Sequence, residues 1–355
     1  MSSFPTRPEE LNADRLTEYL RSAGVLGDAA VSEVSSKVIG TGKMGENVRL
    51  SLSYDGDPGE APATLVAKLP ATDERARAMA GGSGAYYHEV MFFRALADRT
   101  SMRTPRIYAS ELSEDRTSFL LLMEDLSPAE PGNQLVGASR AEAEVSLAEA
   151  AKLASAFYGD EGLAEVDYVV SAAKDDGGAM GQALMEQSWP DFADRYGHGL
   201  SAECLAFGEQ YAPKHSRFVM RYDGAKTLIH GDFRSENILY AGGTAAIVDW
   251  QTTSESSPLA DAAYFLGGSL ESSDRRDWER ALIEQYRQNL EAGGAVLSAQ
   301  DCWDQYREFS MHGLMITVLG ATFSTPDERS DRMFLAMIQR HLQHCIDLDA
   351  AEFLA

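Results

Sequence analysis

The alternation of apolar and polar residues changes character near Met123. Upstream of it, Val48, Leu50, Leu52 and Tyr54 alternate with polar residues, which is the period-two pattern of a strand with one buried face. Strands are predicted at residues 34–39, 48–54 and 65–69, and the continuous apolar run at 119–123 predicts a buried strand. Apolar residues at helical spacing predict helices at residues 11–23 and 85–96.

Downstream of Met123 the apolar spacing is mainly that of amphipathic helices. These helices are predicted at residues 141–158, 180–196, 275–292 and 301–323. A hairpin interrupts them, with strands at 237–241 and 244–250 joined by Gly242-Gly243, a pair that suits a two-residue turn with positive φ.

This change of pattern predicts an α+β protein with two lobes. Residues 1–123 would form a small β-rich lobe, and residues 124–355 a larger, mainly helical lobe. The length of 355 residues supports this division, because single hydrophobic cores usually stop growing below that size.

Net charge narrows the range of partners. At −24, the chain repels the phosphates of nucleic acids and of anionic lipids, so neither a nucleic acid nor a membrane is expected as a partner. The charge would attract a cationic ligand, or it serves solubility alone. The three cysteines form no CxxC pair, and the first residues, MSSFPTRPEE, lack an apolar signal segment, so a cytoplasmic location is expected.

The strongest chemical signal is HGDFRSEN, residues 230–237. Phosphoryl transfer needs a carboxylate to accept the proton of the attacking hydroxyl and an oxygen ligand for Mg²⁺, and Asp232 and Asn237 fit these roles. Asp249, where the returning hairpin strand ends, offers a second acid for the same ion. A plain turn followed by a capping aspartate explains the combination less well.

This segment resembles the HGDxxxxN loop of the aminoglycoside phosphotransferase and choline kinase superfamily, distant relatives of protein kinases. The resemblance implies a bilobal, protein-kinase-like fold that uses ATP and Mg²⁺. It makes Asp232 the catalytic base, Asn237 and Asp249 the metal ligands, and His230 a brace for the loop. Arg234 falls where protein kinases carry a lysine near the γ-phosphate, which implies a catalytic role.

The upstream lobe carries the expected nucleotide-binding residues in the kinase order. Gly40, Gly42 and Gly45 form a GxGxxG followed by a strand, which favours a kinase-type glycine loop over a dinucleotide-binding loop. Lys68 lies in a VAK-like strand, and Glu89 on the next helix would pair with it. Taken singly, these residues would be an ordinary turn, a surface lysine and a solvated glutamate.

The run LLLMEDL, residues 120–126, resembles the kinase hinge that pairs with adenine. Met123 would line the base pocket, Glu124 would offer its carbonyl and Leu126 its amide, although a simple strand end fits these residues equally well. Asp261 opens a predicted helix and would support the catalytic loop from beneath. Six large side chains of the second lobe could be core or acceptor pocket: Trp189, Phe192, Tyr196, Trp303, Met311 and Met315.

Together these motifs predict an ATP-dependent kinase that phosphorylates a hydroxyl of a small-molecule acceptor. LLLMEDL, HGDFRSENIL, VDWQ and DAAYFLGGSL are similar to the ecdysteroid-kinase-like, or CHK-kinase-like, branch of the superfamily. The acidic charge favours a cationic acceptor such as an aminoglycoside or amino alcohol, whereas the aromatic and Met-rich helices favour an apolar, sterol-like one. The oligomeric state stays open.

Three other functions fit less well. A protein kinase needs a peptide-docking segment, and the stretch between Asp249 and Asp261 is too short for one. A regulatory module that binds nucleotide without catalysis is expected to have lost Asp232, Asn237, Asp249 or Lys68, and all are present. A nucleotidyl transferase on the same fold remains an alternative that product analysis would separate.

Overall fold

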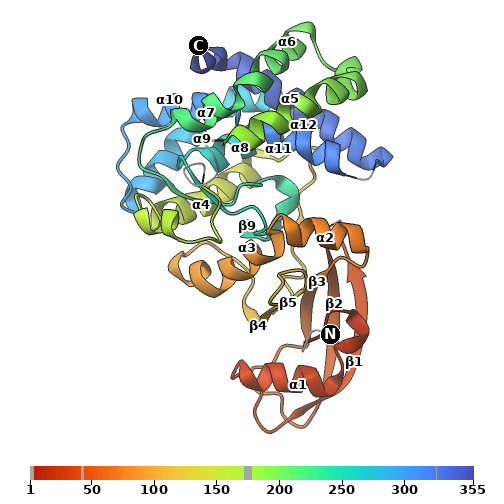
Figure 1. Ribbon diagram of the computed structural model, residues 1–355. Helices are drawn as coiled ribbons and strands as arrows, with labels where there is room; N and C mark the ends of the chain where they lie inside the picture. Colours follow the sequence, from red (N-terminus) through yellow and green to blue (C-terminus); the bar gives the residue numbers. More distant parts are fainter. Residues whose placement is uncertain (1–3, 41–43, 172–177, 325) are drawn as a thin grey trace. The chain divides into compact units, whose positions relative to one another are not determined.

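The computed structural model describes residues 4–40, 44–171, 178–324 and 326–355. The chain divides into two compact units (Figure 1). The first contains Met1–Arg99, Thr104–Pro128 and Asp249–Gln251, and the second contains Thr100–Arg103, Ala129–Val248 and Thr252–Ala355. The first unit therefore extends past the predicted boundary at Met123 and takes in a short segment from far downstream.

The first unit is built on a five-stranded sheet in the order β1-β2-β3-β5-β4, with every neighbouring pair antiparallel. All four predicted strands of this region are confirmed, and β4 is an addition. The strands are β1 (Ala30–Ile39), β2 (Gly45–Asp55), β3 (Thr64–Pro70), β4 (Ile107–Leu112) and β5 (Phe119–Glu124).

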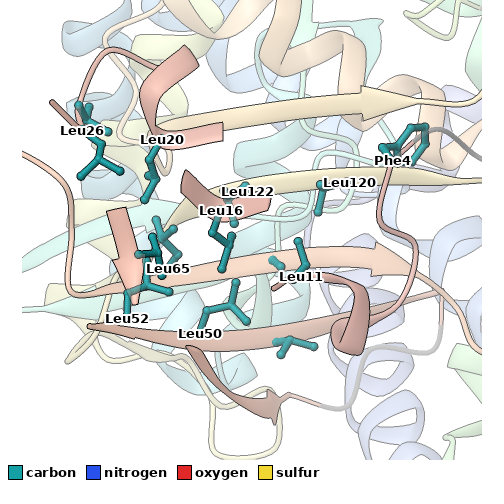
Figure 2. Packing of buried hydrophobic residues seen from close by; sticks show 14 of the residues in the cluster. Phe4, Leu11, Leu16, Leu20, Leu26, Leu50, Leu52, Leu65, Leu120 and Leu122 are labelled. Atoms are coloured by element: carbon teal, nitrogen blue, oxygen red, sulfur yellow. The ribbon is translucent and has the colours of Figure 1, made fainter. Parts of the chain in front are cut away.

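Both faces of this sheet are covered, which explains why β5 is apolar throughout. Leu120 and Leu122 belong to the cluster on the face that packs on helix α1 (Ala13–Ser22), and Figure 2 shows Leu122 near Leu16 of that helix. Phe119 and Leu121 point to the opposite face and belong to a second cluster. A strand buried on both faces shows no polar alternation.

Helices α2 (Glu74–Gly82) and α3 (Ala85–Met91) supply that second cluster, through residues such as Tyr86 and Val90. The helix predicted at 85–96 is confirmed in position, but after Met91 it continues as a π-helical turn, Phe92–Leu96. Such turns are rare and frequently accompany functional sites.

The second unit is mainly helical, and two small sheets, β6-β8-β9 and β7-β10, lie within it. Its helices are α4 (Arg140–Ala156), α5 (Ala179–Tyr196), α6 (Ala202–Tyr211), α7 (His215–Arg221), α8 (Ala260–Ser269), α9 (Ser272–Ala292), α10 (Ala299–Phe309), α11 (His312–Phe323) and α12 (Glu328–Asp347). Its strands are β6 (Glu130–Pro131), β7 (Thr227–Ile229), β8 (Ile238–Ala241), β9 (Thr244–Ile247) and β10 (Ser254–Ser256). The α+β fold class is confirmed.

The predicted helix at 301–323 is in fact two helices, α10 and α11, with a break at Ser310. The Ser310 hydroxyl donates to the carbonyl of Arg307 at 2.7 Å, which is the local side-chain bond that competes with helix propagation. The hairpin of β8 and β9 is confirmed, with φ of +54° at Gly242 and +78° at Gly243, but β9 ends at Ile247 and not at Trp250.

None of the helices in the described residues is both long enough and apolar enough to cross a lipid bilayer.

Candidate functional site

The loop after β7 is held in place by α8. Asp261, in the first turn of α8, accepts hydrogen bonds from the backbone N–H groups of His230, at 2.7 Å, and of Gly231, at 3.1 Å. Burial raises the pKa of the Asp261 carboxyl, and the two donors compensate part of that cost. The His230 ring lies in the same framework, with Nε2 at 3.0 Å from the carbonyl oxygen of Val248.

Gly231 is required by the shape of the loop. Its φ of +84° is in the left-handed region, which favours glycine. A Cβ at this position would also overlap the carbonyl oxygen of Thr252, whose hydroxyl donates to the carbonyl of His230 at 2.9 Å. Backbone geometry therefore requires glycine at the second position of the HGD motif.

Asp232 follows, with its carboxylate held by three donors. Tyr264 of α8 donates its hydroxyl to Oδ1 at 2.7 Å. Arg234 Nε donates to Oδ2 at 3.2 Å, and Asn237 Nδ2 donates to the same oxygen at 2.9 Å. The carboxylate stays 24% exposed, so it is oriented by the protein and remains reachable.

Arg234 is bound to carboxylates within its own loop. Besides Asp232, it contacts Glu236 Oε2 through Nη1 at 2.6 Å, and Glu236 is in turn paired with Arg329. Burial lowers the pKa of Arg234, but the charge of Asp232 and the other partners outweigh it and raise the pKa, so the guanidinium stays charged. Sequence reasoning missed Glu236, which occupies a variable position of HGDxxxxN, and Tyr264, which lies in α8 outside the motif.

The first unit contains the expected lysine and glutamate pair. Lys68 on β3 contacts Glu89 on α3, with Nζ to Oε1 at 2.7 Å, and Asp249, with Nζ to Oδ1 at 3.1 Å. The Lys68 and Glu89 side chains are only 8% and 2% exposed. Burial alone would lower the pKa of Lys68, but Asp249 and Glu89 raise it above its usual value, so the amine is a fixed cation.

The VDWQ segment is anchored in the same unit. Trp250 is buried and stacks on Phe92, with ring centroids 3.5 Å apart and planes 3° apart. Gln251 donates from Nε2 to Glu89 Oε2 at 3.3 Å. Asp249 itself has a φ of +70°, an unusual conformation for a residue other than glycine, and such strain concentrates at functional sites.

The two expected metal ligands fall in different units, Asn237 in the second and Asp249 in the first. Their chemistry fits Mg²⁺, which prefers oxygen ligands. The Asn237 Nδ2 donates both to the backbone oxygen and to the carboxylate of Asp232, at 2.8 and 2.9 Å, which leaves the side-chain oxygen as the atom that can ligate a cation.

The glycine loop is partly described. Gly40, directly after β1, has a φ of +73°, and Gly45 begins β2, where an added Cβ would lie 3.0 Å from the carbonyl oxygen of Leu69. Gly42 lies outside the described residues. The strands on either side pair as an antiparallel hairpin, as the sequence predicts.

The expected hinge is the end of β5. Met123 pairs with Val66 of β3, Glu124 is the last strand residue, and Leu126 lies in the loop that follows. Between them, Asp125 forms an ion pair with Arg49, with 2.9 Å from Nε to Oδ2.

The second unit also contains a cavity of about 630 Å³ that sequence reasoning missed. Its walls are largely apolar and include residues of α5, α7, β7, β10, α10 and α11, so no single motif marks it. Lining residues include Leu184, Phe218, Phe309, Ile316, His215 and His312. Of the six large side chains left open between core and pocket, Met315 lines this cavity, Trp189, Phe192, Tyr196 and Met311 are buried, and Trp303 is half-buried.

Among the described residues that line this cavity, the only charged ones are Lys226 and Glu255, and they form an ion pair at 3.2 Å. Burial lowers the pKa of both His215 and His312 to about 4, so the two imidazoles are neutral at pH 7. The part of the lining that the structure describes therefore carries no net charge.

Several solved structures resemble this chain in fold. Choline kinase from Cryptosporidium parvum Iowa II has a TM-score of 0.58 at 10% identity, covering 96% of this chain and 97% of its own. A microcompartment-associated aminopropanol kinase has a TM-score of 0.56 at 12% identity, with 96% and 99% covered. The GDP complex of aminoglycoside 2'-phosphotransferase-IIIa has a TM-score of 0.52 at 14% identity, with 96% and 99% covered. These likenesses confirm the protein-kinase-like fold.

No curated protein sequence matches the chain significantly. The profile of the ecdysteroid kinase-like family, in contrast, matches residues 42–297, well over half of the 355 residues. That range includes Lys68, Glu89 and the whole segment from His230 to Asp261. The resemblance inferred from the motifs is confirmed, and the chain belongs to the ecdysteroid kinase-like family.

Proposed function

We propose that this protein is an ATP-dependent kinase that transfers the γ-phosphate to a hydroxyl group of a small-molecule acceptor. The observation that carries the proposal is the Asp232 carboxylate, oriented by three donors and still partly exposed. A carboxylate held in this way is suited to accept the proton of an attacking hydroxyl.

In the proposed reaction, the hydroxyl oxygen of the acceptor forms a bond to the γ-phosphorus while its proton passes to Asp232. The bond between that phosphorus and the β,γ-bridging oxygen breaks, and ADP leaves. Lys68, held by Glu89, supplies a fixed positive charge for the α- and β-phosphates. Arg234 is charged and adjacent to Asp232, which suits it to stabilise the transferring phosphoryl group.

Mg²⁺, when bound through the oxygens of Asn237 and Asp249, would neutralise phosphate charge. Gly40, Gly42 and Gly45 are proposed to contact the phosphates, and Met123, Glu124 and Leu126 the adenine. The hinge proposal is supported by the position of these residues at the end of β5.

The cavity of the second unit supports an uncharged and largely apolar acceptor. Lys226 and Glu255 neutralise each other, and His215 and His312 are neutral at pH 7, so an ammonium group would find no unpaired carboxylate among the lining residues that the structure describes. A buried cation without a partner is strongly unfavourable. Of the two acceptor classes that the sequence leaves open, we therefore propose the apolar one.

The proposed setting is the cytoplasm. The three cysteines, Cys204, Cys302 and Cys345, are all buried and unpaired, as in a reducing compartment. The net charge of −24 supports the proposal that neither a nucleic acid nor a membrane is a partner.

The proposal is tested by measuring ADP release from MgATP in the presence of alcohols, amino alcohols, sugars, aminoglycosides and sterols. Asp232→Asn should retain MgATP binding, measured as a rise in melting temperature, and lose transfer by at least about 100-fold. Asp191→Asn, which changes an exposed carboxylate of α5, is the matched control and should behave as wild type. Unchanged turnover in Asp232→Asn would refute the proposal.

The products separate the remaining alternatives. A nucleotidyl transferase on this fold would release pyrophosphate and leave AMP on the acceptor, whereas the kinase releases ADP. A regulatory module would bind MgATP, release neither product, and show no difference between wild type and Asp232→Asn.

A further inference from the structure

Helix α8 holds the catalytic loop at two points. Asp261 and Tyr264 are three residues apart in this helix and therefore lie on the same face. Asp261 binds the loop backbone at His230 and Gly231, and Tyr264 donates to the side chain of Asp232. One helix thus fixes both the path of the loop and the orientation of its carboxylate.

The Tyr264 ring is itself held from two sides. His341 of α12 stacks on it, with centroids 5.2 Å apart and planes 4° apart, and His312 of α11 meets it edge-on, with centroids 6.0 Å apart. Tyr264 is fully buried, so its hydroxyl has little freedom to leave Asp232. His312 also lines the cavity of the second unit, so Tyr264 contacts both a cavity-lining residue and the carboxylate.

The phenol is a permanent donor. Burial, followed by the charge of Asp232, raises the pKa of Tyr264 well above its usual value, so the hydroxyl keeps its proton. Every residue of α8 is buried, and the other large side chains of the helix, Phe265 and Leu266, are apolar. Phenylalanine at position 264 would fill the same apolar space. The tyrosine hydroxyl is therefore explained by its hydrogen bond to Asp232 and not by packing.

The two carboxylate oxygens of Asp232 differ in how many hydrogen bonds they accept. A carboxylate offers about two lone-pair sites on each oxygen. Oδ2 of Asp232 accepts from both Arg234 and Asn237, whereas Oδ1 accepts from Tyr264 alone among the described residues. Oδ1 therefore has a site left to take a proton, and the Tyr264 bond sets the direction of that site.

We infer that Tyr264 is a positioning residue, which orients Oδ1 of Asp232 to receive the proton of the acceptor hydroxyl. The inference rests on the proposed kinase function. In the transfer step, the O–H bond of the acceptor breaks, its electron pair forms the new bond to the γ-phosphorus, and the proton moves to Oδ1. The bond between that phosphorus and the β,γ-bridging oxygen breaks, and ADP leaves. Tyr264 exchanges no proton in this step.

The test compares two tyrosines that are buried in the same unit. Tyr264→Phe removes the donor to Asp232, and Tyr286→Phe removes a donor to the carbonyl of Pro258, at 2.5 Å. For each variant, kcat and KM for MgATP are measured by ADP release with the acceptor found in the screen, or with water as acceptor if none is found. Melting temperatures with and without MgATP show that each variant folds and binds nucleotide.

We expect kcat of Tyr264→Phe to fall at least about tenfold, equivalent to about 1.4 kcal/mol, with KM for MgATP within about twofold of wild type. Tyr286→Phe should lower the melting temperature and leave kcat within about twofold. If the two substitutions change kcat equally, the inference about Tyr264 is wrong. It is also wrong if Tyr264→Phe keeps the kcat of wild type while Asp232→Asn is inactive, and in both cases the kinase proposal stands. An active Asp232→Asn, or no turnover of wild type with any acceptor or with water, would overturn the kinase proposal and this inference with it.

Discussion

Replacing Gly231 by alanine should destabilise the second unit by two separable effects. Alanine in the left-handed region costs about 1–2 kcal/mol, since Gly231 has a φ of +84°. The new methyl group would also overlap the carbonyl oxygen of Thr252, and overpacking of this kind costs about 1–3 kcal/mol. Because the opposing atom belongs to the backbone, it cannot rotate away. The expected loss in the free energy of unfolding is about 2–5 kcal/mol.

Gly242→Ala is the matched control, because Gly242 also has positive φ, at +54°, but no atom lies within 4 Å of its added Cβ. It should lose only the conformational part, about 1–2 kcal/mol. Urea unfolding followed by circular dichroism at pH 7 measures both losses. If Gly231→Ala loses no more stability than Gly242→Ala, the overlap with Thr252 is not real, and the geometry given for the loop is wrong.

Two further predictions concern buried charge and buried imidazole. Glu89→Gln should lower the free energy of unfolding by about 1.5–3 kcal/mol and reduce the MgATP-induced rise in melting temperature, because Lys68 loses its shortest ionic contact. The control Glu33→Gln, at an exposed position of β1, should change neither quantity. The pKa of His215 is lowered by burial to about 4, so the unfolded chain takes up its proton first, and the free energy of unfolding should fall as the pH drops from about 6.5 to about 4. His215→Gln can still accept a hydrogen bond from Tyr211 and should reduce the slope of unfolding free energy against pH by up to about 1.4 kcal/mol per pH unit. Urea unfolding at pH 7, 6 and 5 measures this slope, and an unchanged slope would contradict the assignment of a neutral imidazole.

Much of the first unit could be predicted because its signals are local. The alternation of Val48, Leu50 and Leu52 gives β2 directly, and the order of Lys68 and Glu89 along the chain predicts an ion pair that the structure contains. Strand β4 was missed because Ile107–Leu112 mixes apolar and charged residues without regular alternation, and its place at the sheet edge depends on β5.

The features that could not be predicted are non-local. Tyr264 reaches Asp232 across 32 positions of sequence, and a tyrosine in an apolar helix gives no sign of its partner. The cavity combines residues from Val170 to Leu319, each of which by itself looks like ordinary core. At the helix break, the Ser310 hydroxyl bonds back to the carbonyl of Arg307, a local contact that the apolar period does not indicate.

The segment Asp249–Gln251 has a consequence for the synthesis of the protein. It belongs to the first unit, yet 181 positions separate Lys68 from Asp249, and most of the residues between them belong to the second unit. At about 5–20 residues per second, a ribosome needs on the order of 10–40 s to supply Asp249 after Lys68 has been made. During this interval the nascent sheet lacks the indole that stacks on Phe92 and one of the two carboxylates that contact Lys68. The ribosome starts with residues of the first unit, but the last segment of that unit is synthesised only after about half of the second unit has been translated.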